Sequence, residues 1–225
     1  HRAAHHGRSV TKEVASHCTH AIDLHTGAVN RPNLPQIRFS PDVPGTVEMA
    51  SAFDAPVMME SSTLPGSFRE VFAKQRIPQL LFEGGEAEIL EPTPVKIAIK
   101  GVVNVMRHLQ MLPKERNPQN TPDSAFCHDS YWERAPRGGL FLPQVDLGAV
   151  VKQGSILGKV GDPFGARKTT IRADHEGVVI GRARNAVIDE GDGIFHIGLT
   201  ECLDCVVDNL EAAEADLDHR LCLLY

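Results

Sequence analysis

Apolar residues in the first half of the chain recur at the spacings of short helices and buried strands. Val10, Val14 and His17 fall on one face of a helix that Ser9 can cap, which predicts a helix over 9–20. The same pattern predicts strands at 21–25, 36–39, 56–60 and 77–82 and helices at 67–74 and 92–111. Helices and strands that alternate in this way are typical of an α/β layer structure.

The longest predicted helix covers 92–111, where apolar side chains recur at helical spacing. Pro94 falls in its first turn, where a missing backbone N–H is tolerated. Residues 28–56, in contrast, contain five prolines and little periodicity. We therefore expect this stretch to be rich in loops, with the short strand at 36–39 as its regular element.

A change of composition divides the chain. Residues 112–127 are polar and rich in proline, which is typical of a linker. Beyond them, short apolar stretches alternate with glycine turns, which predicts an all-β region. We therefore expect an α/β region at 1–111, a linker at 112–127 and a β-rich, barrel-like region at 128–225. The tail at 205–225 is acidic and then apolar, and is expected to end in a short helix.

The composition limits the classes of function. The 225 residues carry a net charge of −6 without a basic tract that could neutralise phosphates, so the sequence argues against a general nucleic-acid binder. No apolar run approaches the roughly 20 residues that span a bilayer, so no membrane partner is expected. The chain starts without Met and without the apolar core of a secretion signal. We expect either an internal piece of a longer protein or a processed protein, with a cytoplasmic location by default.

The cysteines do not indicate a disulfide scaffold. There are five of them, an odd number, in a chain far longer than a disulfide-stapled miniprotein. Cys202 and Cys205 form a single Cys-x-x-Cys pair without a second pair at zinc-ribbon spacing. We therefore expect reduced thiols, with ordinary half-buried positions favoured over a redox or metal site.

The predicted strand at 21–25 ends in a polar pattern that can carry chemistry. Asp23 and His25 are two residues apart, so on a strand both side chains point to the same side. A histidine that binds a metal usually needs a carboxylate or carbonyl to fix its tautomer, which makes this pair a candidate zinc site. The alternative is a hydrogen-bonded Asp beside a solvent-facing His, and these residues alone leave both interpretations open.

Glu83 stands at the end of the apolar strand predicted at 77–82 and precedes two glycines. The carboxyl ends of strands in α/β sheets are where such folds place their ligand-binding crevices. A carboxylate there can take a proton from a zinc-bound water and later deliver it to a leaving amine. Taken alone, Glu83 is better explained as a surface residue in a turn.

Three stretches together resemble the succinylglutamate desuccinylase/aspartoacylase family of zinc hydrolases, which is related to the metallocarboxypeptidases. The first is Asp23-Leu24-His25-Thr26-Gly27 with the downstream Arg31-Pro32-Asn33-Leu34-Pro35. The second is Phe82-Glu83-Gly84-Gly85. The third is the glycine-rich region that opens with Trp132-Glu133-Arg134-Ala135-Pro136-Arg137-Gly138-Gly139 and continues through Gly148, Gly154 and Gly161. They occur in the order of the family and span nearly the whole chain.

The resemblance implies a fold, an activity and three site residues. The fold is part of a zinc-carboxypeptidase-like α/β/α layer domain, followed by a small all-β barrel-like module. His25 becomes the third zinc ligand, Glu83 the carboxylate that activates water, and Asp23 the support of the histidine. The reaction is hydrolysis of the amide bond of a small N-acyl amino acid, with one Zn²⁺ per complete site. A homo-oligomer is a possible assembly.

The sequence departs from the family in one respect that bears on activity. The other two family ligands come from an upstream His-x-x-Glu element, and no histidine of this chain starts that pattern. The upstream Asn-Arg pair that would hold the substrate carboxylate is also absent. Because a catalytic zinc typically takes three protein ligands, we expect a truncated chain that binds zinc weakly and hydrolyses nothing. Arg31 and Arg38 could meet an anionic substrate, although solvent-facing loop positions are favoured.

Two other interpretations stay open. Gly148-x-x-Val151-x-x-Gly154 resembles the hairpin of lipoyl- and biotinyl-type carrier modules, which would require a modified lysine such as Lys168. Lys168 lacks the sequence setting of those carriers. A further possibility is a non-catalytic fragment whose β-rich region mediates assembly.

Overall fold

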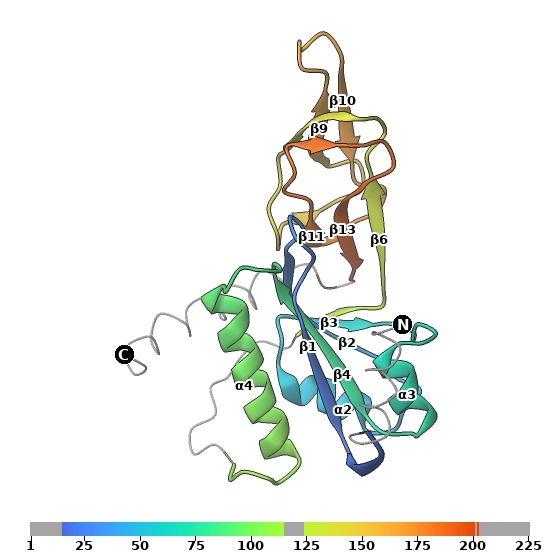
Figure 1. Ribbon diagram of the computed structural model, residues 1–225, viewed down its shortest axis with the longest axis vertical. Coiled ribbons are helices and arrows are strands. Elements are labelled where there is room, and N and C mark those ends of the chain that lie inside the picture. The colour runs from blue at the N-terminus through green and yellow to red at the C-terminus, as the bar shows by residue number, and fades with distance from the viewer. Residues whose placement is uncertain (1–14, 115–123, 201, 203–225) are drawn as a thin grey trace.

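The computed structural model describes residues 15–114, 124–200 and 202 (Figure 1). The first half contains η1 (Ala15–His17), β1 (Ala21–His25), β2 (Asn33–Phe39), α2 (Thr46–Phe53), β3 (Val57–Glu60), α3 (Phe68–Lys74), β4 (Gln79–Gly85) and α4 (Pro92–His108). The second half is made of strands: β5 (Ala125–Cys127), β6 (Asp129–Arg134), β7 (Gly139–Pro143), β8 (Val150–Val151), β9 (Ile156–Gly161), β10 (Lys168–Arg172), β11 (Gly177–Arg182), β12 (Val187–Ile188) and β13 (Gly193–Leu199).

The first half is built on a mixed sheet. β1 runs parallel to β4, β4 is antiparallel to β2, and β3 runs parallel to both β2 and β5. α2 and α4 pack on one face of this sheet, where Phe53, Leu80, Phe82 and Ile97 belong to one buried cluster. The rings of Phe53 and Phe82 stack at 5.7 Å between centroids. This face is therefore closed by helices, as expected for the apolar side of a sheet.

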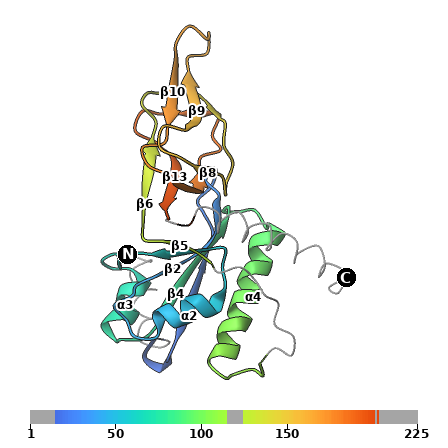
Figure 2. The same cartoon turned by 180° about the vertical axis from the view of Figure 1, so that it is seen from behind.

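The β-rich half stands at one end of the mixed sheet (Figure 1). β6, β13 and β11 are antiparallel neighbours, and a second sheet has the order β10-β9-β7-β12. Their shared core includes Leu157, Val160, Ile194 and Phe195, each completely buried. Seen from behind in Figure 2, β6 and β13 again lie beyond the end of β2 and β5.

The two halves are continuous at β2. Asn33 at the start of β2 pairs with Gly181 of β11, so one sheet runs from β1 through to β6. A third apolar cluster packs at this junction and includes Leu34, Met59 and Ile180. The junction brings strands of the β-rich half next to the residues that follow β1.

The mixed α/β fold predicted from the sequence is confirmed, with several local differences. α2 lies within the stretch predicted to be loop-rich, and β2 is longer than the strand predicted at 36–39. Gly45 and Asp54, which flank α2, both have positive φ. The helix therefore begins and ends at sharp turns, and it is too short to show a long periodic pattern in the sequence. Ala125–Cys127, at the end of the predicted linker, forms β5 and pairs with β3.

The predictions for the two ends of the chain fall partly outside the described residues. Of the helix predicted over 9–20, the described part contains the short 3-10 helix Ala15–His17, and 9–14 lie outside the described residues. The terminal helix predicted within 205–225 also lies outside them.

Cys202 is disulfide-bonded, so the expectation of reduced thiols is wrong for this residue. Within the described ranges, no helix has the length and apolar character needed to cross a membrane.

Candidate functional site

His25 and Glu83 are direct neighbours across the β1–β4 ladder. They are Cα partners in the parallel pairing, and neighbouring strands lie about 4.8 Å apart. Leu80 and Phe82 of β4 belong to the core under the helices. Because successive side chains on a strand point to opposite faces, His25 and Glu83 share the other face of the sheet.

Asp23 and His25 form the pair that their spacing suggested. His25 Nε2 lies 3.1 Å from Oδ2 of Asp23, and the side chains are 50% and 29% exposed. The carboxylate can hold the Nε2–H tautomer of the ring, which leaves Nδ1 as the nitrogen with a lone pair for another ligand. The arrangement therefore suits a histidine that binds a metal at an accessible site.

The Glu83 carboxylate is oriented from β2. The side-chain amide of Asn33 donates a short hydrogen bond to Glu83 Oε2. Gln36 is the Cα partner of Glu83 on the same strand and is completely buried. Neither polar atom of its side chain has a partner among the described residues. Two amides of β2 thus lie beside the carboxylate, one bonded to it and one without a partner.

Two arginines lie on this side of the sheet as well. Arg38 is two residues beyond Gln36 on β2, and Arg69 comes from α3. Burial lowers the pKa of Arg69, and the charge of Arg38 lowers it further, while the charge of Glu83 opposes both effects. The guanidinium of Arg69 donates to the backbone oxygens of Ser61 and Ser62 and to the Ser61 hydroxyl. Its described contacts are therefore those of a residue that holds the loop after β3.

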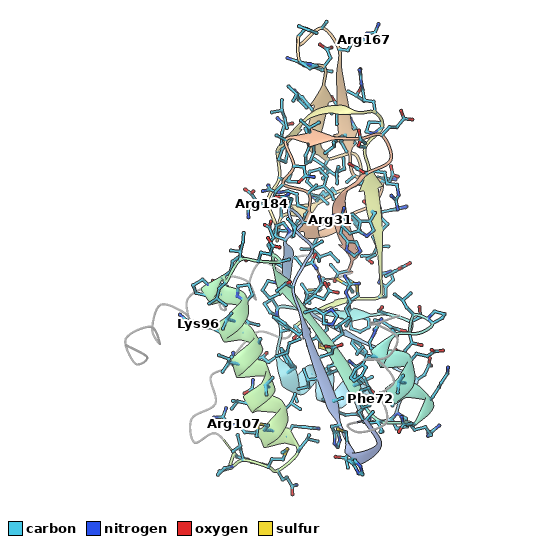
Figure 3. All side chains as sticks on the ribbon, in the orientation of Figure 1. Arg31, Phe72, Lys96, Arg107, Arg167 and Arg184 are labelled. Carbon is cyan, nitrogen blue, oxygen red and sulfur yellow. The ribbon has the colours of Figure 1, made fainter. Side chains whose placement is uncertain are left out.

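The β-rich half reaches the site through stacked side chains. The Trp132 ring stacks on His196 at 4.5 Å between centroids with planes 12° apart, and the Arg31 guanidinium lies 5.3 Å from the Trp132 ring centroid. Figure 3 shows Arg31 where the β-rich half meets the mixed sheet. Burial and, secondarily, the charge of Arg38 lower the pKa of His196 to about 3. His196 is therefore a neutral, buried histidine that packs under the tryptophan.

The helix side of β1 is hollowed. An apolar groove of about 460 Å³ lies between β1 and α4, with His25 and Thr26 at one edge. Leu24 and Ile99, which line it, are 54% and 59% exposed. β1 pairs with β4 along one edge, and no other described strand pairs with it. The groove and this edge form an apolar surface next to His25.

The metal site predicted around His25 has no complete ligand set in the described part of the chain. No group of three or more His, Cys, Asp or Glu side chains that could hold a metal ion occurs there. The residues that sequence reasoning missed are Asn33, Gln36 and Arg69. The strand predicted at 36–39 alternates polar Gln36 and Arg38 with apolar Ile37 and Phe39, and this alternation was a signal that one of its faces is polar.

Comparisons with known proteins identify the fold. No protein-family profile and no curated protein matches the chain. Among solved structures, the ectoine utilization protein EutE (DoeB) from Ruegeria pomeroyi matches with a TM-score of 0.77 at 22% identity, over 86% of this chain and 64% of that protein. A succinylglutamate desuccinylase/aspartoacylase from Rhodobacter sphaeroides matches with a TM-score of 0.76 at 20% identity, over 86% and 62% of the two chains.

A succinylglutamate desuccinylase from Silicibacter sp. TM1040 matches in the same way, with a TM-score of 0.74 at 22% identity, over 86% of this chain and 62% of that protein. The chain therefore has the mixed α/β fold of this class of solved structures. Its resemblance to the succinylglutamate desuccinylase/aspartoacylase family, which the sequence motifs suggested, is confirmed at the level of the fold. The chain spans 62–64% of the length of these structures.

Proposed function

We propose that the chain is part of a zinc-dependent hydrolase that cleaves the amide bond of small N-acyl amino acids. The observation that carries this proposal is the pairing of His25 with Glu83 on one face of neighbouring strands. Each of the two is held by a polar neighbour, His25 by Asp23 and Glu83 by Asn33. The fold shared with desuccinylase/aspartoacylase structures supports the same class of reaction.

In this proposal the layers of the first half are those of a zinc-carboxypeptidase-like catalytic domain. Residues 1–111 belong to that domain, 112–127 connect it, and 128–225 form a barrel-like domain. The junction at Asn33 and Gly181 then lies between the two domains and close to the reacting groups. Such placement is consistent with a small-molecule site at the edge of a sheet.

His25 is the residue of this chain that would hold Zn²⁺, through Nδ1, while Asp23 fixes the ring at Nε2. When bound, the metal supplies Lewis-acid polarisation of the scissile carbonyl and of water. Glu83 takes a proton from the attacking water, so that the oxygen adds to the carbonyl carbon. The same carboxyl group then delivers the proton to the nitrogen as the C–N bond breaks, which releases a carboxylate and an amine. The Asn33 amide keeps the Glu83 carboxylate in one orientation.

One ligand does not make a tight zinc site. A catalytic zinc usually has three protein ligands, and His25 is the one that the resemblance assigns in these 225 residues. We propose that the other two are supplied by polypeptide outside this sequence, either a longer native chain or a companion chain. The 225 residues alone are then expected to bind zinc weakly and to lack hydrolase activity.

Zinc titration by calorimetry tests the assignment of His25. We expect weak binding by the chain, and a loss of this binding in His25→Ala. His108→Ala is the matched control, since His108 is an exposed histidine at the end of α4. Tight one-to-one binding by the chain alone, or binding that survives in His25→Ala, would contradict the proposal.

Turnover tests the role of Glu83. The experiment uses the completed protein, in which a longer native chain or a companion chain supplies the His-x-x-Glu element. It follows the release of amine from a panel of N-acetyl and N-succinyl amino acids. Glu83→Gln should lower the rate by at least about a hundredfold, as expected for loss of a general acid–base group. Glu88→Gln, an exposed change five residues further along, is the control. A Glu83→Gln protein with the rate of the control would rule out this role.

A further inference from the structure

A buried carboxylate that the proposed reaction does not use lies directly after β4. Glu86 is 4% exposed and stands three residues beyond Glu83. Its Oε2 atom accepts a hydrogen bond at 2.8 Å from Nη1 of Arg184, which follows β11 in the β-rich half. This hydrogen bond and, secondarily, the charge of Glu86 raise the pKa of Arg184. The ion pair therefore joins the two halves of the chain.

The other oxygen of the same carboxylate holds the loop that follows His25. The backbone N–H of Asn30 donates to Glu86 Oε1 at 2.6 Å. The backbone C=O of Asn30 accepts a hydrogen bond from the backbone N–H of Arg184 at 2.8 Å. Both main-chain groups of Asn30 are thus engaged, one by each member of the ion pair. These three contacts are called the Glu86–Asn30–Arg184 latch below.

The latch acts on a tight turn. Asn30 has φ 56°, in the left-handed region that few residues other than glycine adopt. The backbone N–H of Arg31 donates to the C=O of Ala28 at 3.0 Å, which closes the turn around Asn30. Just before it, the N–H of Gly27 donates to the C=O of Gly85 at 3.0 Å. The loop is therefore attached both to the end of β4 and to the β-rich half.

The turn places Arg31 over the face of Trp132. The guanidinium carbon of Arg31 lies 5.3 Å from the centroid of the Trp132 ring, a distance at which a cation and an aromatic face attract each other. Figure 3 labels Arg31 and Arg184 where the β-rich half meets the mixed sheet. Because Arg31 directly follows Asn30, the position of its guanidinium depends on the turn that the latch holds.

The chemistry of the latch favours a role in geometry over one in stability. The Glu86 side chain is 5% exposed and that of Arg184 is 47% exposed. A carboxylate that is removed from water in this way gains little net stability from its partner, because desolvation offsets the attraction. Removing the partner would leave a buried charge unpaired, which is costly. The pair therefore fixes the arrangement of its neighbours, and here the neighbour is the loop after His25.

We propose that Glu86 is a positioning residue of the hydrolase and that Arg184 completes the latch from the β-rich half. The role in turnover rests on the proposed function, whereas the latch itself does not. Glu86 holds the loop after His25 in place before substrate binds. Without the latch, a fraction of the molecules has the loop in place, and the apparent affinity for substrate falls with that fraction. Bound substrate restores the loop, so the bound complex reacts at an unchanged rate.

Trp132 is the single tryptophan of the chain and reports the position of the loop without zinc or substrate. Quenching of its fluorescence by acrylamide measures how far Arg31 covers the ring. We expect Glu86→Ala to raise the quenching constant toward that of Arg31→Met, which lacks the guanidinium. Circular dichroism verifies that each variant is folded. Wild-type quenching in a folded Glu86→Ala protein would overturn the proposal.

Variants of Arg184 test the other end of the latch. Arg184→Met changes a half-exposed side chain, so it tests the latch even where Glu86→Ala does not fold. It should quench like Glu86→Ala, and the double variant should go no further, because two residues that act as a unit are not additive. Arg184→Lys keeps the charge and should recover part of the protection. Asp146→Asn breaks the nearby ion pair with Arg182 and should leave quenching unaltered. Additive effects of the two latch variants would overturn the latch.

Steady-state kinetics of the completed protein test the role in positioning. A hydrogen bond to a charged group changes an equilibrium constant by about tenfold or more. Glu86→Ala should therefore raise KM for N-acyl amino acids by about tenfold and leave kcat unchanged. Asp146→Asn should keep both constants. A fall in kcat at unchanged KM would reject positioning through the loop.

The outcome is separable from that of the proposed function. Quenching that depends on Glu86 and Arg184, in a completed protein that hydrolyses no N-acyl amino acid, would retain the latch and reject the hydrolase. Hydrolysis that is lost in Glu83→Gln, together with unchanged quenching and KM in Glu86→Ala, would do the reverse.

Discussion

The side-chain amide of Asn33 donates a hydrogen bond to Glu83 and at the same time lies against Gly181 of the β-rich half. A Cβ atom at position 181 would lie 3.0 Å from Asn33 Oδ1 and 3.1 Å from the Cβ of His196. The absence of a side chain on Gly181 thus lets β11 approach the residue that orients the proposed base. The position of Glu83 depends on strands from both halves of the chain.

Gly181→Ala tests this contact. We expect the added methyl group to displace Asn33 and to destabilise the chain by about 1–3 kcal/mol, the usual cost of overpacking. Urea unfolding measures the change. Gly161→Ala is the control, because the nearest atoms to a Cβ there are at 3.4 and 3.5 Å, which is ordinary van der Waals contact. Equal stability of the two variants would show that Asn33 is not held by β11.

His196 is expected to make stability depend on pH. Its folded pKa of about 3 lies below the ordinary value of 6.5. Between these values the unfolded state binds more protons than the folded state, so the free energy of unfolding rises with pH. The contribution is present above about pH 6.5 and is lost as the pH falls toward about 3. Its slope is at most about 1.4 kcal/mol per pH unit.

The measurement is the free energy of unfolding between about pH 4 and pH 6, compared in wild type and in His196→Gln. The variant should show a shallower slope, because it lacks the group that takes up a proton on unfolding. His108→Gln, at an exposed position of α4, should keep the wild-type slope. Parallel curves for all three proteins would contradict a buried neutral His196.

Gly101→Ala is expected to destabilise the chain although alanine is the better helix former. In an exposed helix this change would stabilise by about 1 kcal/mol. Here a Cβ would lie 2.1 Å from the Phe53 ring, so α2 and α4 would have to separate. Thermal unfolding should show a lower midpoint for Gly101→Ala, and Phe53→Leu in the same chain should recover part of the loss. A higher midpoint would show that the ring moves aside freely.

The groove between β1 and α4 is expected to bind a fluorescent dye that recognises exposed apolar surface. Large exposed apolar patches mark surfaces that associate with other molecules, and Ile99 is 59% exposed there. Ile99→Glu should reduce the fluorescence of bound anilinonaphthalene sulfonate with little change in unfolding. Met111→Glu is the control, since Met111 is 64% exposed and lies outside the groove. A similar loss of fluorescence in both variants would place the dye elsewhere.

Several elements could be predicted because their signals are local. The strand at 21–25 and the long helix that begins near residue 92 have uninterrupted apolar periodicity, and the structure has β1 and α4 there. α2 was missed because a short helix between turns offers little periodicity in a stretch dense in proline. Its burial against α4 and β2 stabilises it, and such contacts are invisible in a local pattern.

The residues of the candidate site could be predicted from the sequence only in part. Asp23, His25 and Glu83 each stand at the polar end of an apolar strand, which made them candidates, and the resemblance to the family implied their roles. Asn33 and Gln36 could not be assigned in this way. Their relation to Glu83 depends on the antiparallel register of β2 against β4, which is set by packing over the whole sheet.

The amino-acid sequence by itself determined which polar residues interrupt the apolar strands, because periodicity and strand ends are properties of neighbouring positions. The tertiary structure decided which of these residues meet. It set His25 opposite Glu83, placed Gln36 and Arg38 on the same face, and brought Gly181 of the β-rich half against Asn33. These contacts join residues that are far apart along the chain, so strand register and the burial of side chains between layers establish them.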